Sequence, residues 1–379
     1  MIPACVADYR ELARKRLPDM LFQYLDGGSY AETTLRRNVS DLEAVTLRQR
    51  VMRDVSGLSL ETELFGEELA MPVVLAPVGM SGMYASRGET QAARAAERAG
   101  VPFCLSTLSI CGVDEVAKSV ERSIWFQLYM TKDRGFMETL LARAAASGCK
   151  VLVFTVDLPA PGARYSDVRT RLTGGKGFDA WFSRTWDGVS HPAWTADLFL
   201  KGLPHSFANV AAAIPEAKSN TDYWSWIRQN FDPGVTWSDL AWVRNRWDGP
   251  IVLKGVLDVE DARQAAQVGA DGLIVSNHGG RQLDSALSGV AALPRVAEAV
   301  GDRATVLMDG GVRSGEDVVK AMALGAQACL IGRPWAYALA ARGEAGVAHV
   351  LELFRKQMTT TMVLAGCDDV AKIGTALLA

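Results

Sequence analysis

The fold is constrained most by a recurring alternation of short apolar runs with amphipathic stretches. Each run has the length of a single strand and consists largely of Val, Ile, Leu or aromatic residues. The runs are Val73–Pro77, Pro102–Leu105, Ile124–Tyr129, Val151–Val156, Ile251–Leu253, Gly272–Val275, Thr305–Met308 and Ala328–Ile331. We interpret them as strands of a parallel sheet, because strands that are covered on both faces read as continuous apolar segments.

The stretches between several of these runs have helical spacing. Thr90–Ala99, Glu260–Val268 and Glu316–Leu324 are amphipathic, and a glycine follows each of them, as is common just past the end of a helix. Strands that alternate with helices form parallel βαβ units, and eight units predict a closed α/β structure, the (β/α)8 TIM barrel. The alternative, an open doubly wound sheet, normally carries G-x-G-x-x-G after its first strand, and this sequence does not.

Two regions lie outside the repeat, and we expect them to be parts of one barrel domain that spans residues 1–379. Residues 1–70 form a mainly helical lead-in, and residues 165–247 form a long insertion after the fourth strand. An insertion of this length is typical of a lid or an interaction segment. Its many tryptophans in a polar setting favour contact with a membrane surface, whereas the alternative is a small core packed on the barrel. These tryptophans are Trp181, Trp186, Trp194, Trp224, Trp226, Trp237, Trp242 and Trp247.

Composition excludes several classes of protein. The net charge of −3, from 40 basic and 43 acidic residues, gives no reason to expect nucleic-acid binding. The six cysteines form no C-x-x-C pair, which predicts reduced thiols in a cytoplasmic protein and no metal site. Asp8 and Arg10 precede any apolar segment, so we expect no signal peptide. No apolar run reaches the roughly 18 residues that a membrane-spanning helix needs.

The loop that follows Gly272–Val275 is the most informative motif. Its residues, Ser276-Asn277-His278-Gly279-Gly280-Arg281-Gln282, bring an imidazole and a guanidinium to one strand end. The two glycines between them let the backbone approach a ligand closely. A base beside an anion-binding group suits chemistry on a small carboxylic acid. The alternative is a surface loop whose histidine bonds to the backbone.

In a barrel, all the carboxyl ends of the strands meet at the active-site face. The ends predicted here are Ala76-Pro77-Val78-Gly79, Ser106-Thr107, Gln127-Leu128-Tyr129, Thr155-Val156-Asp157, Lys254-Gly255, Ser276-Asn277-His278, Asp309-Gly310-Gly311-Val312-Arg313 and Gly332-Arg333. The last two ends offer free backbone N–H groups and two guanidiniums, at the position where barrels bind a phosphate.

Two further side chains carry chemistry at these ends. Lys254 follows Ile-Val-Leu and is expected inside the mouth of the barrel, where it would form a Schiff base or place a fixed positive charge beside an anionic cofactor. Asp157 would orient and stabilise a protonated His278, provided that the fold brings the two side chains together.

Together these residues resemble the FMN-dependent family that oxidises L-2-hydroxy acids. The run from Ser276 to Gln282 is the central motif of that family, and the likeness extends from Asp8 to about Gly366. Within the family, the sequence is most similar to the bacterial membrane-associated, quinone-linked L-lactate dehydrogenases. Three segments carry that closer likeness: Thr34-Leu35-Arg36-Arg37-Asn38, Pro161-Gly162-Ala163-Arg164-Tyr165 and Asn230-Phe231-Asp232-Pro233.

The resemblance implies FMN as the cofactor and assigns roles to individual residues. Those that would contact the flavin ring or ribityl chain are Ser106, Gln127, Thr155, Lys254 and Ser276, and the backbone along the N5 edge is that of Ala76, Pro77, Val78 and Gly79. Those that would hold the ribityl and phosphate groups are Asp309, Gly311, Arg313, Gly332 and Arg333. Those that would bind the substrate are Tyr24, Arg164 and Arg281 at its carboxylate and Tyr129 at its hydroxyl. His278, paired with Asp157, would be the catalytic base.

The implied reaction is oxidation of the C2 hydroxyl of an L-2-hydroxy acid, with L-lactate favoured. His278 would take either the carbon-bound or the hydroxyl proton, and Lys254 would stabilise negative charge on the reduced flavin. The electrons would pass to a membrane quinone or another respiratory carrier. The resemblance further implies a homotetramer that lies peripherally on the inner face of the cell membrane.

Several alternatives stay open from the sequence. Gly79 stands where oxidases of the family usually carry alanine, which favours a dehydrogenase over an oxidase that uses O₂. We expect no haem domain of the yeast type.

Mandelate or glycolate is an alternative substrate, and Val78, Leu108 and the insertion would line the side-chain pocket. A non-redox, phosphate-binding isomerase or aldolase would use Lys254 as a Schiff base but leaves Gln127 and Thr155 unexplained. A flavin-binding protein without turnover is the third class.

Overall fold

The computed structural model describes residues 2–170, 189–214, 216–217 and 220–379. Within these residues, parallel strands form an eight-stranded sheet that is hydrogen-bonded in the order β3-β10-β9-β8-β7-β6-β5-β4. A further bridge between Leu75 and Phe103 joins the two ends of the sheet into a ring. The strands are β3 (Val73–Leu75), β4 (Cys104–Ser106), β5 (Trp125–Tyr129), β6 (Leu152–Thr155), β7 (Ile251–Val256), β8 (Gly272–Val275), β9 (Thr305–Met308) and β10 (Ala328–Ile331). The predicted barrel is therefore confirmed, and the open sheet is excluded.

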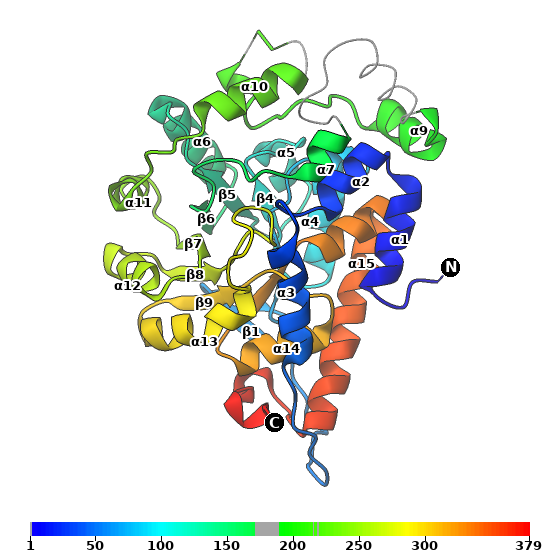
Figure 1. The fold of residues 1–379 in the computed structure, drawn as a ribbon, viewed down its shortest axis with the longest axis vertical. Coiled ribbons are helices and arrows are strands. Elements are labelled where there is room, and N and C mark those ends of the chain that lie inside the picture. Colours follow the sequence, from blue (N-terminus) through cyan, green and yellow to red (C-terminus); the bar gives the residue numbers. More distant parts are fainter. Residues whose placement is uncertain (1, 171–188, 215, 218–219) are drawn as a thin grey trace.

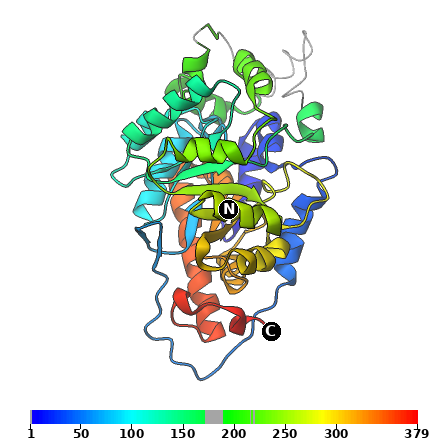
Figure 2. The same cartoon turned by 90° about the vertical axis from the view of Figure 1, so that its left-hand side faces the viewer.

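Helices surround the barrel on its outer side (Figure 1, Figure 2). They are α4 (Gly88–Arg98), α5 (Val113–Ala117), α6 (Arg134–Ala146), α11 (Trp237–Arg244), α12 (Val259–Val268), α13 (Gly289–Val300), α14 (Gly315–Ala323) and α15 (Arg333–Ala365). Helix α12 shows why the sequence pattern works. The Asp258 side chain accepts hydrogen bonds from the first turn, and Gly269 ends the helix with a φ of 99°. A positive φ at this position costs a glycine little.

The interior of the barrel is a separate apolar cluster, because alternate residues of each strand point inward. It includes Val74, Val153 and Leu307, and its lower end is closed by a short hairpin of β1 (Thr62–Leu64) and β2 (Glu67–Leu69). Phe65 at the turn of this hairpin meets the Trp125 ring edge-on, with ring centroids 5.7 Å apart. The lead-in was predicted as mainly helical, and this hairpin was not predicted because three-residue strands carry too little periodicity.

The helices of the lead-in are α1 (Val6–Arg16), α2 (Asp19–Asp26) and α3 (Thr33–Ala44). Helix α1 lies along α15, and α2 lies above it near the mouth of the barrel (Figure 1). Asp26 ties these three elements together: its carboxylate accepts hydrogen bonds from Arg10 at 2.7 Å and from the Tyr337 hydroxyl at 2.5 Å.

The insertion contributes α7 (Tyr165–Arg169), α9 (Pro192–Lys201) and α10 (Asn220–Asn230), which lie at the top of Figure 1. Trp194 and Trp247 are buried, and Trp226, Trp237 and Trp242 pack against the main core. These five tryptophans therefore fit the alternative interpretation, a core packed on the barrel, and not an exposed membrane contact. Trp181, Trp186 and the Trp224 side chain lie outside what the structure describes.

Exposed apolar side chains of the insertion lie on α7, before α9 and on or just after α9. Phe199, Leu200 and Leu203 are 61%, 80% and 62% exposed. Across the described part of the chain, no helix is both long enough and apolar enough to cross a membrane.

Candidate active site

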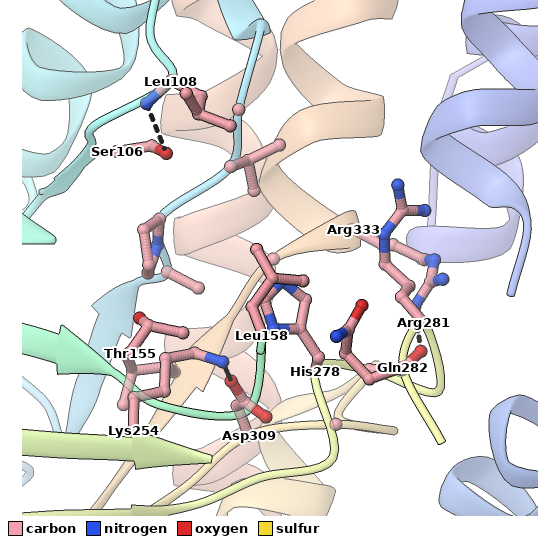
Figure 3. A pocket seen from close by; sticks show the side chains of 18 of the residues that line it. Ser106, Leu108, Thr155, Leu158, Lys254, His278, Arg281, Gln282, Asp309 and Arg333 are labelled. Carbon is pink, nitrogen blue, oxygen red and sulfur yellow. Dashed lines mark hydrogen bonds and ion pairs between the residues drawn. The ribbon is translucent and has the colours of Figure 1, made fainter. Parts of the chain in front are cut away.

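A pocket lies at the carboxyl ends of the barrel strands (Figure 3). Most of the residues predicted for the site line it: Tyr24, Ala76, Pro77, Val78, Gly79, Ser106, Tyr129, Thr155, Arg164, Lys254, His278, Arg281, Asp309, Gly311, Arg313, Gly332 and Arg333. The other three lie one hydrogen bond behind the lining. Gln127 bonds to Ser106, Ser276 to Lys254, and Asp157 to His278.

The imidazole of His278 is paired with the Asp157 carboxylate, with 2.9 Å between Nδ1 and Oδ1. His278 has a left-handed φ of 59°, and its backbone N–H donates to the Ser276 hydroxyl at 3.0 Å. Burial acts to raise the pKa of Asp157, but the charges of His278 and Lys254 outweigh it and lower that pKa. Because an ionised carboxylate only accepts, Nδ1 donates to it, and Nε2 is left to take a proton.

Space for this pair comes from Gly255, which follows Lys254. A Cβ at Gly255 would lie 2.5 Å from the Cβ of Asp157, and the φ of Gly255 is 107°. The register between β7 and β8 shifts at this point. The glycine thus lets the end of β7 turn aside from the Asp157 side chain.

Lys254 is buried and its ammonium is held by two partners. Nζ lies 3.0 Å from Oδ2 of Asp309 and donates to the Ser276 hydroxyl, also at 3.0 Å (Figure 3). Burial acts to lower the pKa of Lys254, but the charges of Asp309 and Asp157 outweigh it and raise that pKa. A Schiff base needs a neutral amine. The geometry therefore favours a fixed positive charge over a nucleophile.

Several buried polar atoms at the strand ends have no hydrogen-bond partner among the described residues. They are Nε2 of Gln127, Oγ1 of Thr155 and Oδ1 of Asp309. Gln127 is held by its other end, where Oε1 accepts from the Ser106 hydroxyl at 3.0 Å. Buried polar groups are nearly always paired. A planar ligand with polar edges would satisfy these atoms.

The ends of β9 and β10 offer an anion site that is built mainly of backbone. Gly310 and Gly311 both have a φ of 88°, and a Cβ at Gly311 would lie 1.9 Å from a backbone oxygen of Asn38. Helix α15 begins at Arg333, so its first N–H groups are free for an anion. Burial lowers the pKa of Arg313, which means that an anion beside it would be stabilised.

The side chain of Arg333, which was predicted to hold the phosphate, bonds to backbone carbonyls in this structure. Its guanidinium donates to the carbonyl oxygens of Leu25, Gly27 and Gly279 at 3.1, 2.9 and 2.9 Å. Arg333 thus caps the carboxyl end of α2, where helix carbonyls lack partners. The contact of Arg333 with a phosphate stays a prediction, and its backbone N–H at the start of α15 is a further group that can bind an anion.

The predicted carboxylate site is a stack of three side chains. The guanidinium carbons of Arg281 and Arg164 lie 4.8 and 5.2 Å from the centre of the Tyr24 ring. Arg281 also donates to the carbonyls of Tyr24 and Gly27 at 2.6 and 2.8 Å. Burial, together with the charge of Arg164, lowers the pKa of Arg281 to about 10. Arg164 is already paired with Asp167, with 2.6 Å between Nε and Oδ2, whereas the hydrogen bonds of Arg281 go to backbone carbonyls, so an anionic ligand at this stack would be stabilised mainly by Arg281.

Tyr129 lies beside this stack and packs against Phe231, with ring centroids 5.3 Å apart. Burial, with the charge of Asp157 added, raises the pKa of Tyr129 well above its usual range. Its hydroxyl therefore keeps its proton and can donate a hydrogen bond.

Other lining residues had no assigned role from the sequence: Leu25, Tyr84, Leu158, Pro161, Ile227, Phe231 and Gln282. Ile227 and Phe231 come from α10 and its end, so the insertion supplies part of the wall. The sequence predicted that the insertion would line the side-chain pocket, but nothing in an isolated apolar residue indicates which of its side chains take part. Gln282 had a signal in its motif: its amide donates to the carbonyl of Asp157 at 2.7 Å and accepts from Gly162 at 3.0 Å.

Comparison with known proteins gives consistent results. The family model for FMN-dependent dehydrogenases matches residues 13–379. L-lactate dehydrogenase of Caulobacter vibrioides is 56% identical over 379 residues, which is all of this chain and 98% of that protein. L-lactate dehydrogenase of Chromohalobacter salexigens is 55% identical over 375 residues, 99% of this chain and 95% of that protein.

Two solved structures are similar over the full chain. A crystal structure of (S)-mandelate dehydrogenase, described as a monotopic membrane protein, superposes with a TM-score of 0.93 at 36% identity and covers 100% of both chains. Mandelate oxidase with (S)-2-phenylpropionate has a TM-score of 0.83 at 38% identity, covering 100% of this chain and 98% of the other.

Proposed function

The chain belongs to the FMN-dependent dehydrogenase family, and on that premise we propose that it oxidises L-lactate to pyruvate. Support for the substrate comes from the L-lactate dehydrogenase relatives, which are 55–56% identical over nearly the whole chain. One structural observation carries the proposal: the pair of His278 and Asp157 shares a pocket with the half-buried guanidiniums of Arg281 and Arg164. A base and an anion site side by side are what a 2-hydroxy acid requires.

FMN is the cofactor, and the residues of the pocket fit it. Gln127, Thr155 and Asp309 present buried polar atoms without partners in the described chain, as the edge of an isoalloxazine ring and its ribityl chain require. Gly311 and the start of α15 would hold the phosphate. When bound, FMN would take up the two electrons and the one hydrogen equivalent that remain after the base has taken a proton.

The side chains would then divide the work on the substrate. Arg281, Arg164 and Tyr24 hold the carboxylate, and the Tyr129 hydroxyl donates to the oxygen on C2. Nε2 of His278 accepts the proton that C2 oxidation releases, and Asp157 stabilises the resulting imidazolium. The Lys254 ammonium holds a fixed positive charge at the end of β7, which favours negative charge at the cofactor.

The decisive experiment mixes the yellow purified protein with L-lactate, glycolate or (S)-mandelate without oxygen and follows flavin absorbance in a stopped-flow instrument. We expect L-lactate to bleach the flavin fastest. Equal or faster bleaching by another acid would overturn the choice of substrate. If none of the three acids bleached the flavin, the protein would be one that binds flavin without oxidising these acids.

We further propose that the electrons pass to a quinone at the inner face of the cell membrane and that the protein is a homotetramer. The similar (S)-mandelate dehydrogenase is described as a monotopic membrane protein. In this chain, the exposed Phe199, Leu200 and Leu203 would supply the apolar contact. Reoxidation of the reduced protein by a soluble quinone analogue should outpace reoxidation by O₂, and light scattering should give four chains per particle.

The alternative electron acceptor is O₂, which would make the protein an oxidase. Gly79 favours a dehydrogenase by resemblance, yet a Cβ at Gly79 would meet the Leu108 carbonyl at 3.4 Å, an ordinary contact. The backbone therefore admits alanine here, and steric exclusion alone does not distinguish the two classes. Faster reoxidation by O₂ than by quinone would identify an oxidase.

A further inference from the structure

A buried carboxylate joins two loops that the reaction itself does not use. Glu89 is the second residue of α4 and is 1% exposed. Its Oε1 accepts the N–H of Gly82 at 2.8 Å and the N–H of Ile110 at 3.0 Å. Gly82 lies in the short helix η1 (Ser81–Met83) after β3, and Ile110 lies in the loop after β4. One oxygen atom therefore connects the loops that leave two neighbouring strand ends.

Those two loops form adjoining parts of the pocket wall. Gly79 and Leu108 both line it, and the N–H of Met80 donates to the carbonyl of Leu108 at 2.9 Å. A Cβ at Gly79 would lie 3.6 Å from the Cβ of Leu108. The walls are thus in contact already, so a small shift of either loop changes the space beside the substrate.

The packing around the Glu89 carboxyl group leaves almost no space into which the two loops could move. A Cβ at Gly82 would lie 2.6 Å from the Cβ of Ile110 and 2.7 Å from Oε2 of Glu89. Oε2 has no hydrogen-bond partner within the described chain, so the two N–H groups on Oε1 are the bonds that hold the carboxylate. Close packing transmits a displacement at this point to both loops.

We propose that Glu89 is a positioning residue that sets the separation of Gly79 and Leu108 and thereby the size of side chain that the pocket accepts. This inference rests on the proposed oxidation of a 2-hydroxy acid for its choice of ligands. Without Glu89, the loops after β3 and β4 separate, so a bulky ligand gains space and a small one loses contacts.

The test measures binding as well as turnover. Dissociation constants of pyruvate and benzoylformate are read from the change in flavin absorbance of the FMN-loaded protein, and their ratio gives the size selectivity. In Glu89→Ala we expect this ratio to shift toward benzoylformate by about 10-fold or more, the scale on which one methylene in a pocket is discriminated. The kcat for L-lactate should change less than its KM, because the groups around His278 are untouched.

Two further variants show whether the change in the ratio comes from the hydrogen bonds of Glu89, from its charge or from a general loss of protein stability. Glu89→Gln keeps an oxygen that accepts both N–H groups, so its ratio should stay close to that of the wild type. Glu97→Ala is the matched control. Glu97 lies eight residues further along α4, about 12 Å away, and its Oε1 accepts from the N–H groups of Glu121 and Arg122 at 2.6 and 2.7 Å. This variant should lose stability without changing the ratio.

An unchanged ratio in FMN-loaded Glu89→Ala would overturn the inference, as would an equal shift in Glu97→Ala. If Glu89→Ala does not fold, Gly82→Ala replaces it, because the added methyl group would collide with the Cβ of Ile110 at 2.6 Å and with Oε2 of Glu89 at 2.7 Å and so pushes the two loops apart. It should shift the ratio in the same direction, and no shift would again contradict the inference. Since binding needs no turnover, failure of lactate oxidation would overturn only the proposed function.

Discussion

His278 and Asp157 are 121 residues apart in the chain and meet because β6 and β8 are both one strand away from β7. Each side chain was predicted from its place at a strand end. Their contact depends on details that the sequence does not show, namely the left-handed backbone of His278 and the space at Gly255. His278 is therefore oriented as a base by its contact with Asp157, and the strand order of the barrel brings the two side chains together.

Replacement of the base gives the most direct prediction. His278→Gln should still bind FMN, because the flavin contacts come from other strand ends, but should slow flavin reduction by L-lactate by about 10²- to 10⁴-fold. Anaerobic stopped-flow absorbance measures this rate. His205→Gln is the control, because His205 bonds to the carbonyl of Leu198, away from the pocket lining. Near-normal reduction in His278→Gln would show that another group is the base.

At the scale of elements, α2 is placed by charges at its carboxyl end. Arg281 and Arg333 donate to the carbonyls of Tyr24, Leu25 and Gly27, and Asp26 receives Arg10 and Tyr337. Cations at this end of a helix satisfy free carbonyls and oppose the negative end of the helix dipole. The helix in turn fixes the Tyr24 ring between two guanidiniums.

Asp26 allows a test of this arrangement by pH. Burial acts to raise the pKa of Asp26, but the bonds from Arg10 and Tyr337 outweigh it and lower that pKa below 3.8. A carboxylate with a lowered pKa in the folded state stabilises the fold above its unfolded pKa of about 3.9 and loses that effect as the pH falls through the folded value.

Asp26→Asn should therefore lower the midpoint of thermal unfolding by about 1–3 °C at pH 7, and the difference should narrow below about pH 4. Differential scanning fluorimetry from pH 3 to pH 8 measures both. Asp19→Asn, on the first turn of the same helix, is the comparison for a substitution outside this network. A difference that stays constant over the whole range would contradict a role for the Asp26 charge.

At the scale of the molecule, the barrel holds the chemistry while the insertion lies above its mouth. Helix α10 contributes Ile227 and Phe231 to the pocket, and α9 carries Phe199, Leu200 and Leu203 outward. Asp197 of α9 is bonded to Arg16 and Ser86 at 2.8 Å, so the helix is fastened to the barrel and to the lead-in. The apolar face is thereby held at the same end of the molecule as the pocket.

Replacing Phe199, Leu200 and Leu203 by serine should reduce binding to liposomes of bacterial lipids by about 10-fold or more, since roughly 2 kcal/mol is lost per large apolar side chain that no longer inserts. Flotation measures the bound fraction, and bleaching by L-lactate should stay as in the wild type. Val51→Ser with Met52→Ser is the control. These side chains are also exposed but lie in the loop between α3 and β1, at the bottom of Figure 1. Equal loss in both variants would rule out a specific role for α9.

The sequence by itself determined the barrel and most of the pocket lining. Buried parallel strands must be continuous apolar runs, and the residues that follow them must meet at one face, so local patterns already specify both. Tertiary structure decided what local patterns do not encode. Contacts between segments far apart in the chain produce the hairpin below the barrel and the hydrogen bonds of Arg333 to the end of α2. Such contacts also place the apolar side chains of the insertion in the pocket wall and join the loops after β3 and β4 at Glu89. Such contacts form only where the folded chain places the two groups within about 3 Å of each other.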